Sequence, residues 1–395
     1  MSRAFHTLLL AQFLSAFADN AILFTAFAMI SRSGGYGEWY KAALQASFLI
    51  AFVVLAPWVG RLADRYSKGQ VLTWGNGLKL LGTLLLLLGV EPLFAYGVVG
   101  VGAAVYGPAK YGILPELVGH ERLVKANGWV EGSTIIAIVF GMVLGAQMAD
   151  RSVGGALLLV GGVYLISLLA TLSLPKTATQ SPDGGAALGH FIVMLRSFFT
   201  SSRARFAMLG AAIFWAAAVV LRVMLVVWAP AVLFIHTTSD IANLTVFIAI
   251  GIALGALVVP WLVPIEQLRR ARLAAYLMGF CILLLAVTRD PVWAKFVLLL
   301  IGFAGGIFVV PINAALQEIG HRSIGAGGAV AIQNFFENLA MLLATGLYSV
   351  ALTRQLDPVA AMLTLGVLVV VATTLIAWQL PRNAEPLVPA ITEKS

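Results

Sequence analysis

Six charged residues lie within stretches of sequence that are otherwise apolar, where they could bind the charged groups of a ligand. Three are acidic and three basic, so they can neutralise one another: Asp19, Lys79, Lys110, Glu131, Arg222 and Glu337. A charge at the centre of a membrane costs at least about 2.5 kcal/mol on insertion scales, so such residues are rare and functional candidates. A guanidinium binds phosphate through paired hydrogen bonds, and a carboxylate binds ammonium. The set therefore suits a ligand that carries both charges.

The composition identifies the class of protein in which these charges must be placed. Of 395 residues, 61% are hydrophobic and 11% charged, whereas soluble domains carry about 25% charged residues. The chain is therefore expected to lie in a membrane, which excludes soluble enzymes. The one cysteine, Cys281, cannot form an intramolecular disulfide, and five scattered histidines show no metal-ligand spacing. We accordingly expect no metal site and no cofactor.

Twelve apolar stretches have the length of about 20 residues that a helix needs to cross the hydrocarbon core. The prediction is an all-α membrane protein with twelve transmembrane helices. The predicted spans are 7–31, 42–61, 71–90, 93–117, 125–149, 153–174, 206–235, 240–263, 273–288, 291–315, 325–351 and 357–380.

A polar connection divides these spans into two groups of six. The predicted domains are an N-terminal six-helix half (1–174), a cytoplasmic central loop (175–205), a C-terminal six-helix half (206–380) and a cytoplasmic tail (381–395). Within the loop, the stretch from His190 to Arg205 mixes apolar residues with arginines, which fits either a short amphipathic helix on the inner membrane surface or a simple linker.

The distribution of lysine and arginine predicts the orientation. With a cytoplasmic N-terminus, sixteen of the 25 basic residues fall on the inner side and six on the outer side. Positively charged loops remain in the cytoplasm, so both termini are expected there, in a multi-pass protein of the membrane. The same bias, together with attraction to anionic membrane lipid, explains the net charge of +8 without a nucleic-acid partner.

The depth of the charged residues separates them into groups. Asp19, Arg222 and Glu337 each lie about 12 to 16 residues into their spans, or roughly 18 to 24 Å deep, which is near the midplane. Two carboxylates and one guanidinium at that depth can hold a zwitterionic headgroup, although a structural ion pair between the halves is the alternative. Lys79 is expected to extend its ammonium toward the inner interface instead.

Polar neighbours and a second charged pair extend this candidate site. Lys110 and Glu131 each lie about seven residues from the cytoplasmic ends of neighbouring spans, where they can form a gate or a headgroup relay. A purely structural role in helix packing is the alternative for both. Asn334 and Asn338 are one helical turn apart beside Glu337. Their amides can supply oxygen ligands to a cation or hydrogen-bond donors to a glycerol hydroxyl.

The loop after the second span, Gly60 to Gln70, resembles the signature loop of the major facilitator superfamily. It contains Arg61, Asp64 and Arg65. The resemblance implies the two-half fold of that superfamily, with Asp64 facing the start of the eleventh span and both arginines near lipid phosphates. We predict gating roles for these three residues, together with Lys110 and Glu131.

A wider set of segments is similar to the bacterial lysophospholipid transporters of this superfamily. They are residues 11–21, 77–82, 108–114, 123–128, 221–223, 309–314 and 333–338. The resemblance implies a flippase that moves 2-acyl lysophospholipids, chiefly lysophosphatidylethanolamine, from the outer to the inner leaflet of the bacterial inner membrane. A separate acyltransferase/acyl-carrier-protein synthetase is then implied for re-acylation. The predicted substrate-binding residues are Asp19, Asn20, Lys110, Arg222, Asn334, Glu337 and Asn338.

Other functions remain open at this level. The runner-up is a cation-coupled transporter of a small soluble solute or drug, and a third hypothesis is a membrane scaffold that recruits the acyltransferase. Proton-driven exporters of the superfamily often carry a motif of glycines and a proline in the fifth span. This chain has the glycines, Gly141 and Gly145, but not the proline, which weakens the interpretation as a proton-coupled antiporter. The sequence has no Gly-Lys pair for a phosphate loop and no histidine followed five positions later by aspartate. We therefore expect no enzyme activity.

Overall fold

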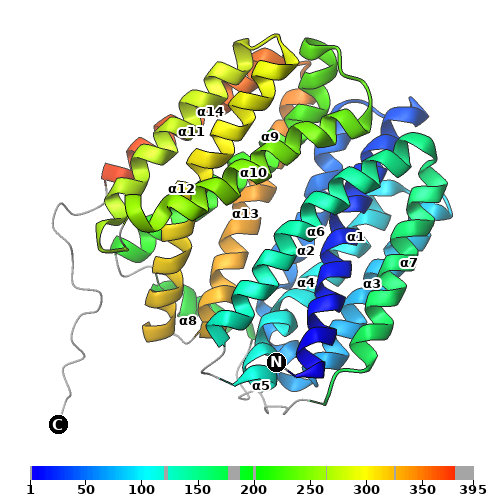
Figure 1. Cartoon of the computed structure of the whole chain (residues 1–395), viewed down its shortest axis with the longest axis vertical. Helices are drawn as coiled ribbons and strands as arrows, with labels where there is room; N and C mark the ends of the chain where they lie inside the picture. Colours follow the sequence, from blue (N-terminus) through cyan, green and yellow to red (C-terminus); the bar gives the residue numbers. More distant parts are fainter. Residues whose placement is uncertain are drawn as a thin grey trace. The chain divides into compact units, whose positions relative to one another are not determined.

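A computed structural model of the chain describes residues 2–119, 123–176, 187–198, 202–263, 265–323 and 326–378. Within these ranges every regular element is a helix (Figure 1). The first helices are α1 (Arg3–Ser33), α2 (Trp39–Arg65), α3 (Lys68–Leu87), α4 (Pro92–Gly112), α5 (Leu114–Val118), α6 (Leu123–Arg151) and α7 (Val153–Leu172).

The second half of the chain continues the pattern. Its helices are α8 (Ala187–Phe198), α9 (Ser202–Trp228), α10 (Thr238–Leu262), α11 (Ala271–Val287), α12 (Pro291–Ser323), α13 (Ala326–Thr353) and α14 (Pro358–Trp378). A π-helical turn, Ala229–Leu233, continues α9, and a 3-10 helix, Ile265–Arg270, precedes α11.

The chain divides into two compact units. Unit 1 comprises Met1–Leu188, Leu225–Val246 and Thr345–Gln355, and unit 2 comprises Gly189–Met224, Phe247–Ala344 and Leu356–Ser395. Unit 1 therefore includes segments from both sides of the central loop. The division into an N-terminal and a C-terminal six-helix half stays a prediction, and the predicted tail lies outside the described residues.

The helix ends follow local rules. Ser2 Oγ accepts a hydrogen bond from Phe5 N at 3.3 Å at the start of α1, and Gly34 ends this helix with a φ of 63°. Ser152 Oγ accepts from Gly155 N at 3.1 Å at the start of α7. Serine side chains satisfy the unpaired N–H groups of a helix start, and glycine adopts the left-handed conformation at little cost.

All twelve predicted spans correspond to helices. In the part of the chain that the structure describes, eleven helices are long and apolar enough to cross a membrane. The twelfth expected span is α3, whose apolar character is reduced by Thr73, Asn76 and Lys79. Asn76 and Lys79 are buried. These buried polar side chains of α3 therefore contact other helices of unit 1.

Glycines position the helices that carry the charged residues of unit 1. Helix α1 packs against α6 and α7, and α3 packs against α4 and α7 (Figure 1). A Cβ atom at Gly145 of α6 would lie 2.5 Å from Ala21 Cα of α1. One at Gly102 of α4 would lie 2.8 Å from Lys79 Cγ of α3. Both contacts need a residue without a side chain, which brings neighbouring backbones together.

Unit 2 includes the predicted amphipathic segment. The short helix α8 covers residues 187–198, whereas Arg203 and Arg205 belong to α9. Phe191 of α8 is buried, and its ring centre lies 5.2 Å from that of Phe335 on α13. The helical alternative, predicted for residues 190–205, is thus confirmed for residues 190–198, and its location at the membrane surface stays a prediction. Elsewhere in this unit, α11 packs against α12 and α14.

Candidate functional site

The carboxylate of Asp19 is bound on both oxygens by side chains from other helices. Lys79 Nζ of α3 donates to Asp19 Oδ2 at 2.8 Å, and Tyr164 Oη of α7 donates to Asp19 Oδ1 at 2.7 Å. The side chain of Lys79 is 2% exposed and that of Asp19 is 23% exposed. The accessible part of this ion pair is therefore the carboxylate, with the ammonium behind it.

The expectation that Lys79 extends to the inner interface is wrong. Its ammonium also donates to Ser15 Oγ at 2.8 Å, and it lies 4.7 Å from the ring centre of Tyr106 and 5.8 Å from that of Tyr164. A carboxylate, a hydroxyl and two aromatic faces stabilise a cation in a low-dielectric interior. Lys79 points inward because these groups satisfy it there.

A chain of hydrogen bonds extends from Lys79 across three helices. Ser15 Oγ donates to Asn76 Oδ1 at 3.0 Å, Asn76 Nδ2 donates to Ser167 Oγ at 2.8 Å, and Ser167 Oγ donates to the carbonyl of Ala11 at 2.7 Å. The sequence analysis missed this network. The sequence spacing could have indicated it. Ser15 precedes Asp19 by four residues and Asn76 precedes Lys79 by three, which places each pair on one helix face.

The other predicted contacts of unit 1 have local partners. The ammonium of Lys110 lies 4.2 Å from the ring centre of Tyr111, and Lys110 is half-buried. Asn20 Nδ2 donates to the carbonyl of Ala16 at 2.9 Å, so part of its amide group is used within α1. The side chain of Glu131 lies outside the described residues, and its pairing with Lys110 stays a prediction.

In unit 2, Glu337 is buried, with 7% exposure, and accepts hydrogen bonds from two helices. Gln333 Nε2 of the same helix donates to Glu337 Oε1 at 2.8 Å and to Asn313 Oδ1 of α12 at 3.0 Å. The side chain of Trp215 on α9 also hydrogen-bonds to Glu337. The carboxylate therefore links α13 to α9. The sequence analysis predicted neither Trp215 as a partner of Glu337 nor Asn313 as a partner of Gln333.

Arg222 and the asparagines lie on the same helices as this carboxylate or its partners. Arg222 is half-buried on α9, seven residues after Trp215. That spacing is about two helical turns, or roughly 10 Å along one face. Asn338 Nδ2 donates to the carbonyl of Asn334 at 2.7 Å. Asp19 belongs to unit 1, whereas Arg222 and Glu337 belong to unit 2. Their convergence on one ligand stays a prediction.

The signature-loop residues lie where α2 ends and α3 begins. Arg65 is in the last turn of α2, and its guanidinium lies 5.8 Å from the ring centre of Tyr66. Lys68 starts α3 and forms an ion pair with Glu116 of α5 at 2.6 Å. Arg61 is half-buried, and the side chain of Asp64 lies outside the described residues. The gating roles of these residues stay predictions.

The far end of unit 1, where α1 finishes, contains links to the segments from the second half of the chain. The carboxylate of Asp150, at the end of α6, accepts hydrogen bonds from Thr238 N at 3.0 Å and Ser239 N at 2.7 Å, at the start of α10. Ser349 Oγ of α13 donates to the carbonyl of Trp39 at 3.0 Å. The sequence analysis assigned no role to Asp150 or Ser349.

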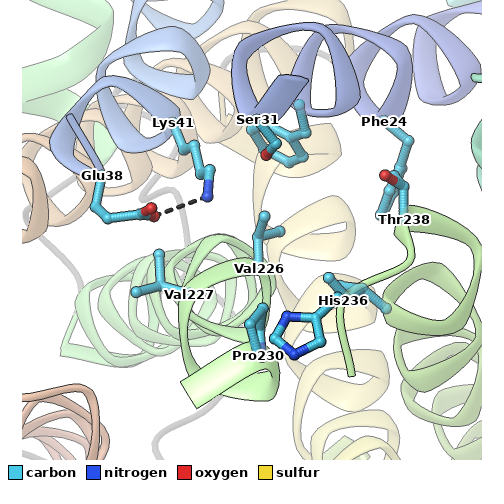
Figure 2. Close-up of a pocket in the computed structure, with 11 residues that line it drawn as sticks. Phe24, Ser31, Glu38, Lys41, Val226, Val227, Pro230, His236 and Thr238 are labelled. Carbon is cyan, nitrogen blue, oxygen red and sulfur yellow. Dashed lines mark hydrogen bonds and ion pairs between the residues drawn. The ribbon is translucent and has the colours of Figure 1, made fainter. Parts of the chain in front are cut away.

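A cavity of about 210 Å³ lies at this far end (Figure 2). Glu38 and Lys41 of α2 form an ion pair of 2.7 Å at its lining, and His236 lies near Pro230 on another side. Thr238 lines the cavity and also donates its backbone N–H to Asp150. The other lining residues are Phe24, Phe27, Ser31, Val226, Val227 and Ile241. Apolar walls and a charged pair make this cavity amphipathic.

The described residues contain no group of three or more histidine, cysteine, aspartate or glutamate side chains that could hold a metal ion. The candidate sites are instead built from charged pairs, amides and tyrosines. Such groups can bind polar and charged parts of a ligand through hydrogen bonds and Coulomb attraction.

An all-helical membrane protein with buried charged pairs of this kind has the features of a membrane transporter. The Major Facilitator Superfamily profile matches residues 8–345. Among solved structures, the nucleoside transporter NupG aligns with a TM-score of 0.73 and 14% identity, covering 95% of this chain and 98% of that chain. A D-xylose-proton symporter aligns with a TM-score of 0.72 and 16% identity, covering 95% and 97%. At these identities the two structures show the shared fold alone.

Three bacterial relatives are more similar, and each is named lysophospholipid transporter LplT. The protein from Cronobacter sakazakii is 44% identical over 365 residues, covering 91% of both chains. That from Photorhabdus laumondii is 40% identical over 379 residues, covering 95% of both. That from Klebsiella pneumoniae is 42% identical over 378 residues, covering 94% of both. The chain belongs to this lysophospholipid transporter family of the major facilitator superfamily.

Proposed function

We propose that this chain is a lysophospholipid flippase of the bacterial inner membrane, carrying lysophosphatidylethanolamine and related lysophospholipids from the outer to the inner leaflet. The observation that carries the proposal is the identity of 40% to 44%, over more than nine tenths of the chain, with relatives named for that substrate. Those relatives are transporters, which agrees with the expectation of no enzyme activity. A separate acyltransferase re-acylates the delivered lipid.

Both termini lie in the cytoplasm in this proposal. The excess of basic residues on the corresponding side supports that orientation. The far end of unit 1, with Asp150 and the amphipathic cavity, then faces the periplasm. Lys68 and Lys110 lie toward the cytoplasm.

The headgroup binds near the middle of the membrane. Arg222 binds the phosphate, and the carboxylates of Asp19 and Glu337 attract the ammonium. The partial exposure of Asp19 and the connection of Glu337 to α9 through Trp215 support these roles. Lys110, Asn20, Asn334 and Asn338 provide further polar contacts along the path.

Transport proceeds by alternating access of the two six-helix halves. The hydrogen bonds from α10 to Asp150 and from Ser349 to Trp39 tie the periplasmic end together, which supports closure at that end. Opening requires these bonds to break. Arg61, Asp64, Arg65, Lys110 and Glu131 contribute the corresponding contacts at the cytoplasmic end.

Transport of labelled lysophosphatidylethanolamine in proteoliposomes tests the proposal. Lipid that has left the outer leaflet resists extraction by albumin, and diacyl phosphatidylethanolamine serves as the parallel substrate. Vesicles with the wild-type protein should protect the lyso form, whereas vesicles with Arg222→Ala and empty vesicles should not. Absence of protection with folded, inserted wild-type protein would contradict the proposal and favour a cation-coupled carrier of a soluble solute.

A further inference from the structure

We infer that Lys79 is a specificity-determining residue, whose buried charge sets the balance between zwitterionic and anionic lysophospholipid headgroups by neutralising Asp19. The inference rests on the proposed function and adds a residue on α3 to the headgroup site. Its basis is the ion pair of 2.8 Å between Lys79 Nζ and Asp19 Oδ2.

The geometry separates the roles of the two partners. Asp19 is 23% exposed and Lys79 is 2% exposed at the side chain, so a headgroup can approach the carboxylate and not the ammonium. The lysine therefore acts on the ligand through Asp19 and through its own electric field. In a low-dielectric interior that field is weakly screened over a few ångströms.

The surrounding groups hold Lys79 in this position. Its ammonium donates to Ser15 Oγ as well as to Asp19, and the ring of Tyr106 lies against it at 4.7 Å. Gly102 leaves space for its stem, because a Cβ there would lie 2.8 Å from Lys79 Cγ. The cation is thus part of the environment of Asp19 in this structure.

The consequence is a pair with no net charge. A lone buried carboxylate would attract a headgroup ammonium and repel a headgroup that carries only phosphate charge. With Lys79 in place, the site should show little preference between zwitterionic and anionic headgroups. Removing the lysine should favour the zwitterionic lipid, and removing the aspartate should favour the anionic lipid.

The experiment compares transport of lysophosphatidylethanolamine with that of lysophosphatidylglycerol, which has no ammonium, in proteoliposomes. The rate for lysophosphatidylethanolamine divided by that for lysophosphatidylglycerol should rise about fivefold or more in the Lys79→Met variant. A change of that size is within the range of couplings measured between contacting residues. Asp19→Asn should lower the ratio. The double variant Asp19→Asn/Lys79→Met restores electroneutrality, and its ratio should return toward that of the wild type.

Lys295→Met provides the matched control, since it removes one lysine from α12, where the ammonium lies 5.8 Å from the ring centre of Phe247. Its ratio should equal that of the wild type. A Lys79→Met variant that lowers both rates by one factor would overturn the inference, because a purely structural lysine predicts that result. If Lys79→Met does not accumulate, equal ratios for Asp19→Asn and the double variant would overturn it.

The outcomes also separate this inference from the function on which it rests. Wild-type protein that transports both lipids, with unchanged ratios in the variants, would overturn the role of Lys79 and leave the flippase proposal intact. Wild-type protein that transports neither lipid would overturn both.

Discussion

Ser239 donates its backbone N–H to the carboxylate of Asp150 at 2.7 Å, which joins the last turn of α6 to the first turn of α10. Thr238 donates to the other oxygen at 3.0 Å. A carboxylate at a helix N-terminus satisfies unpaired N–H groups and interacts favourably with the helix dipole. Here the capping residue comes from another helix, so the cap is also a tie between two segments that lie 88 residues apart.

Replacing Asp150 with alanine should loosen the far end of unit 1. Loss of a cap costs about 0.5–2 kcal/mol, which corresponds to an approximately 2- to 30-fold rise in the population with that end open. A cysteine placed at Val226, a buried residue of the cavity lining, should then react faster with a membrane-impermeant maleimide added from the periplasmic side. Cys281→Ala provides the cysteine-free background, since Cys281 is the one native cysteine.

Asp240→Ala is the matched control for this experiment. Asp240 also lies in the first turn of α10, but its carboxylate accepts from Thr237 Oγ1 at 2.5 Å within the same segment. Its removal should leave the labelling rate of the cysteine at position 226 unchanged. Equal rates in Asp150→Ala and the parent protein would contradict the role of Asp150 as a tie.

Gly145→Ala should destabilise the protein, because the new Cβ would lie 2.5 Å from Ala21 Cα and would push α6 away from α1. Overpacking of this kind typically costs about 1–3 kcal/mol. A lower thermal unfolding temperature in detergent, measured by loss of the monodisperse peak, would show it. Gly162→Ala is the control, since a Cβ added there would have no atom within 4 Å and alanine favours helix. Equal unfolding temperatures for the two variants would refute the packing argument.

Glu337→Gln and Glu337→Ala should differ in stability. Glutamine keeps an oxygen that can accept from Gln333 and Trp215, so the folded protein should accumulate normally while transport falls with the loss of charge. Alanine removes both hydrogen bonds. Gln333 still donates to Asn313 and Trp215 is 37% exposed, so the expected loss is about 0.5–1.5 kcal/mol for each bond. Thermal unfolding and transport should be measured in parallel. Normal transport by Glu337→Gln would show that the charge is dispensable.

The ion pair between Lys68 and Glu116 should show charge-swap rescue. The two atoms Lys68 Nζ and Glu116 Oε1 lie 2.6 Å apart and join the start of α3 to α5. Lys68→Glu alone places two carboxylates together and should lower stability, while Lys68→Glu/Glu116→Lys should recover part of the loss. Measured couplings of contacting residues are about 0.5–3 kcal/mol. Absence of any recovery in unfolding temperature would show that the pair itself contributes nothing.

The membrane-spanning helices could be predicted from the sequence, because the length and apolarity needed to cross a membrane are properties of each segment alone. It also marked Asp19, Arg222 and Glu337 as candidates, since a charge in an apolar span is visible without a structure. A helix within residues 190–205 was one of two interpretations of the local pattern of apolar and basic residues, and the structure has a helix over 187–198. These inferences needed no knowledge of which helices are neighbours.

The partner of each charged side chain, in contrast, depends on how the helices pack. Lys79 and Asp19 are 60 residues apart, and Tyr164 and Asp19 are 145 apart, so their contacts depend on how α1, α3 and α7 pack. The error over Lys79 has the same origin. A lysine on an isolated helix reaches most favourably toward the interface, but glycine contacts bring α3 and α4 close enough to enclose its ammonium among buried partners. Helix packing, which no single segment specifies, determined the direction of that side chain.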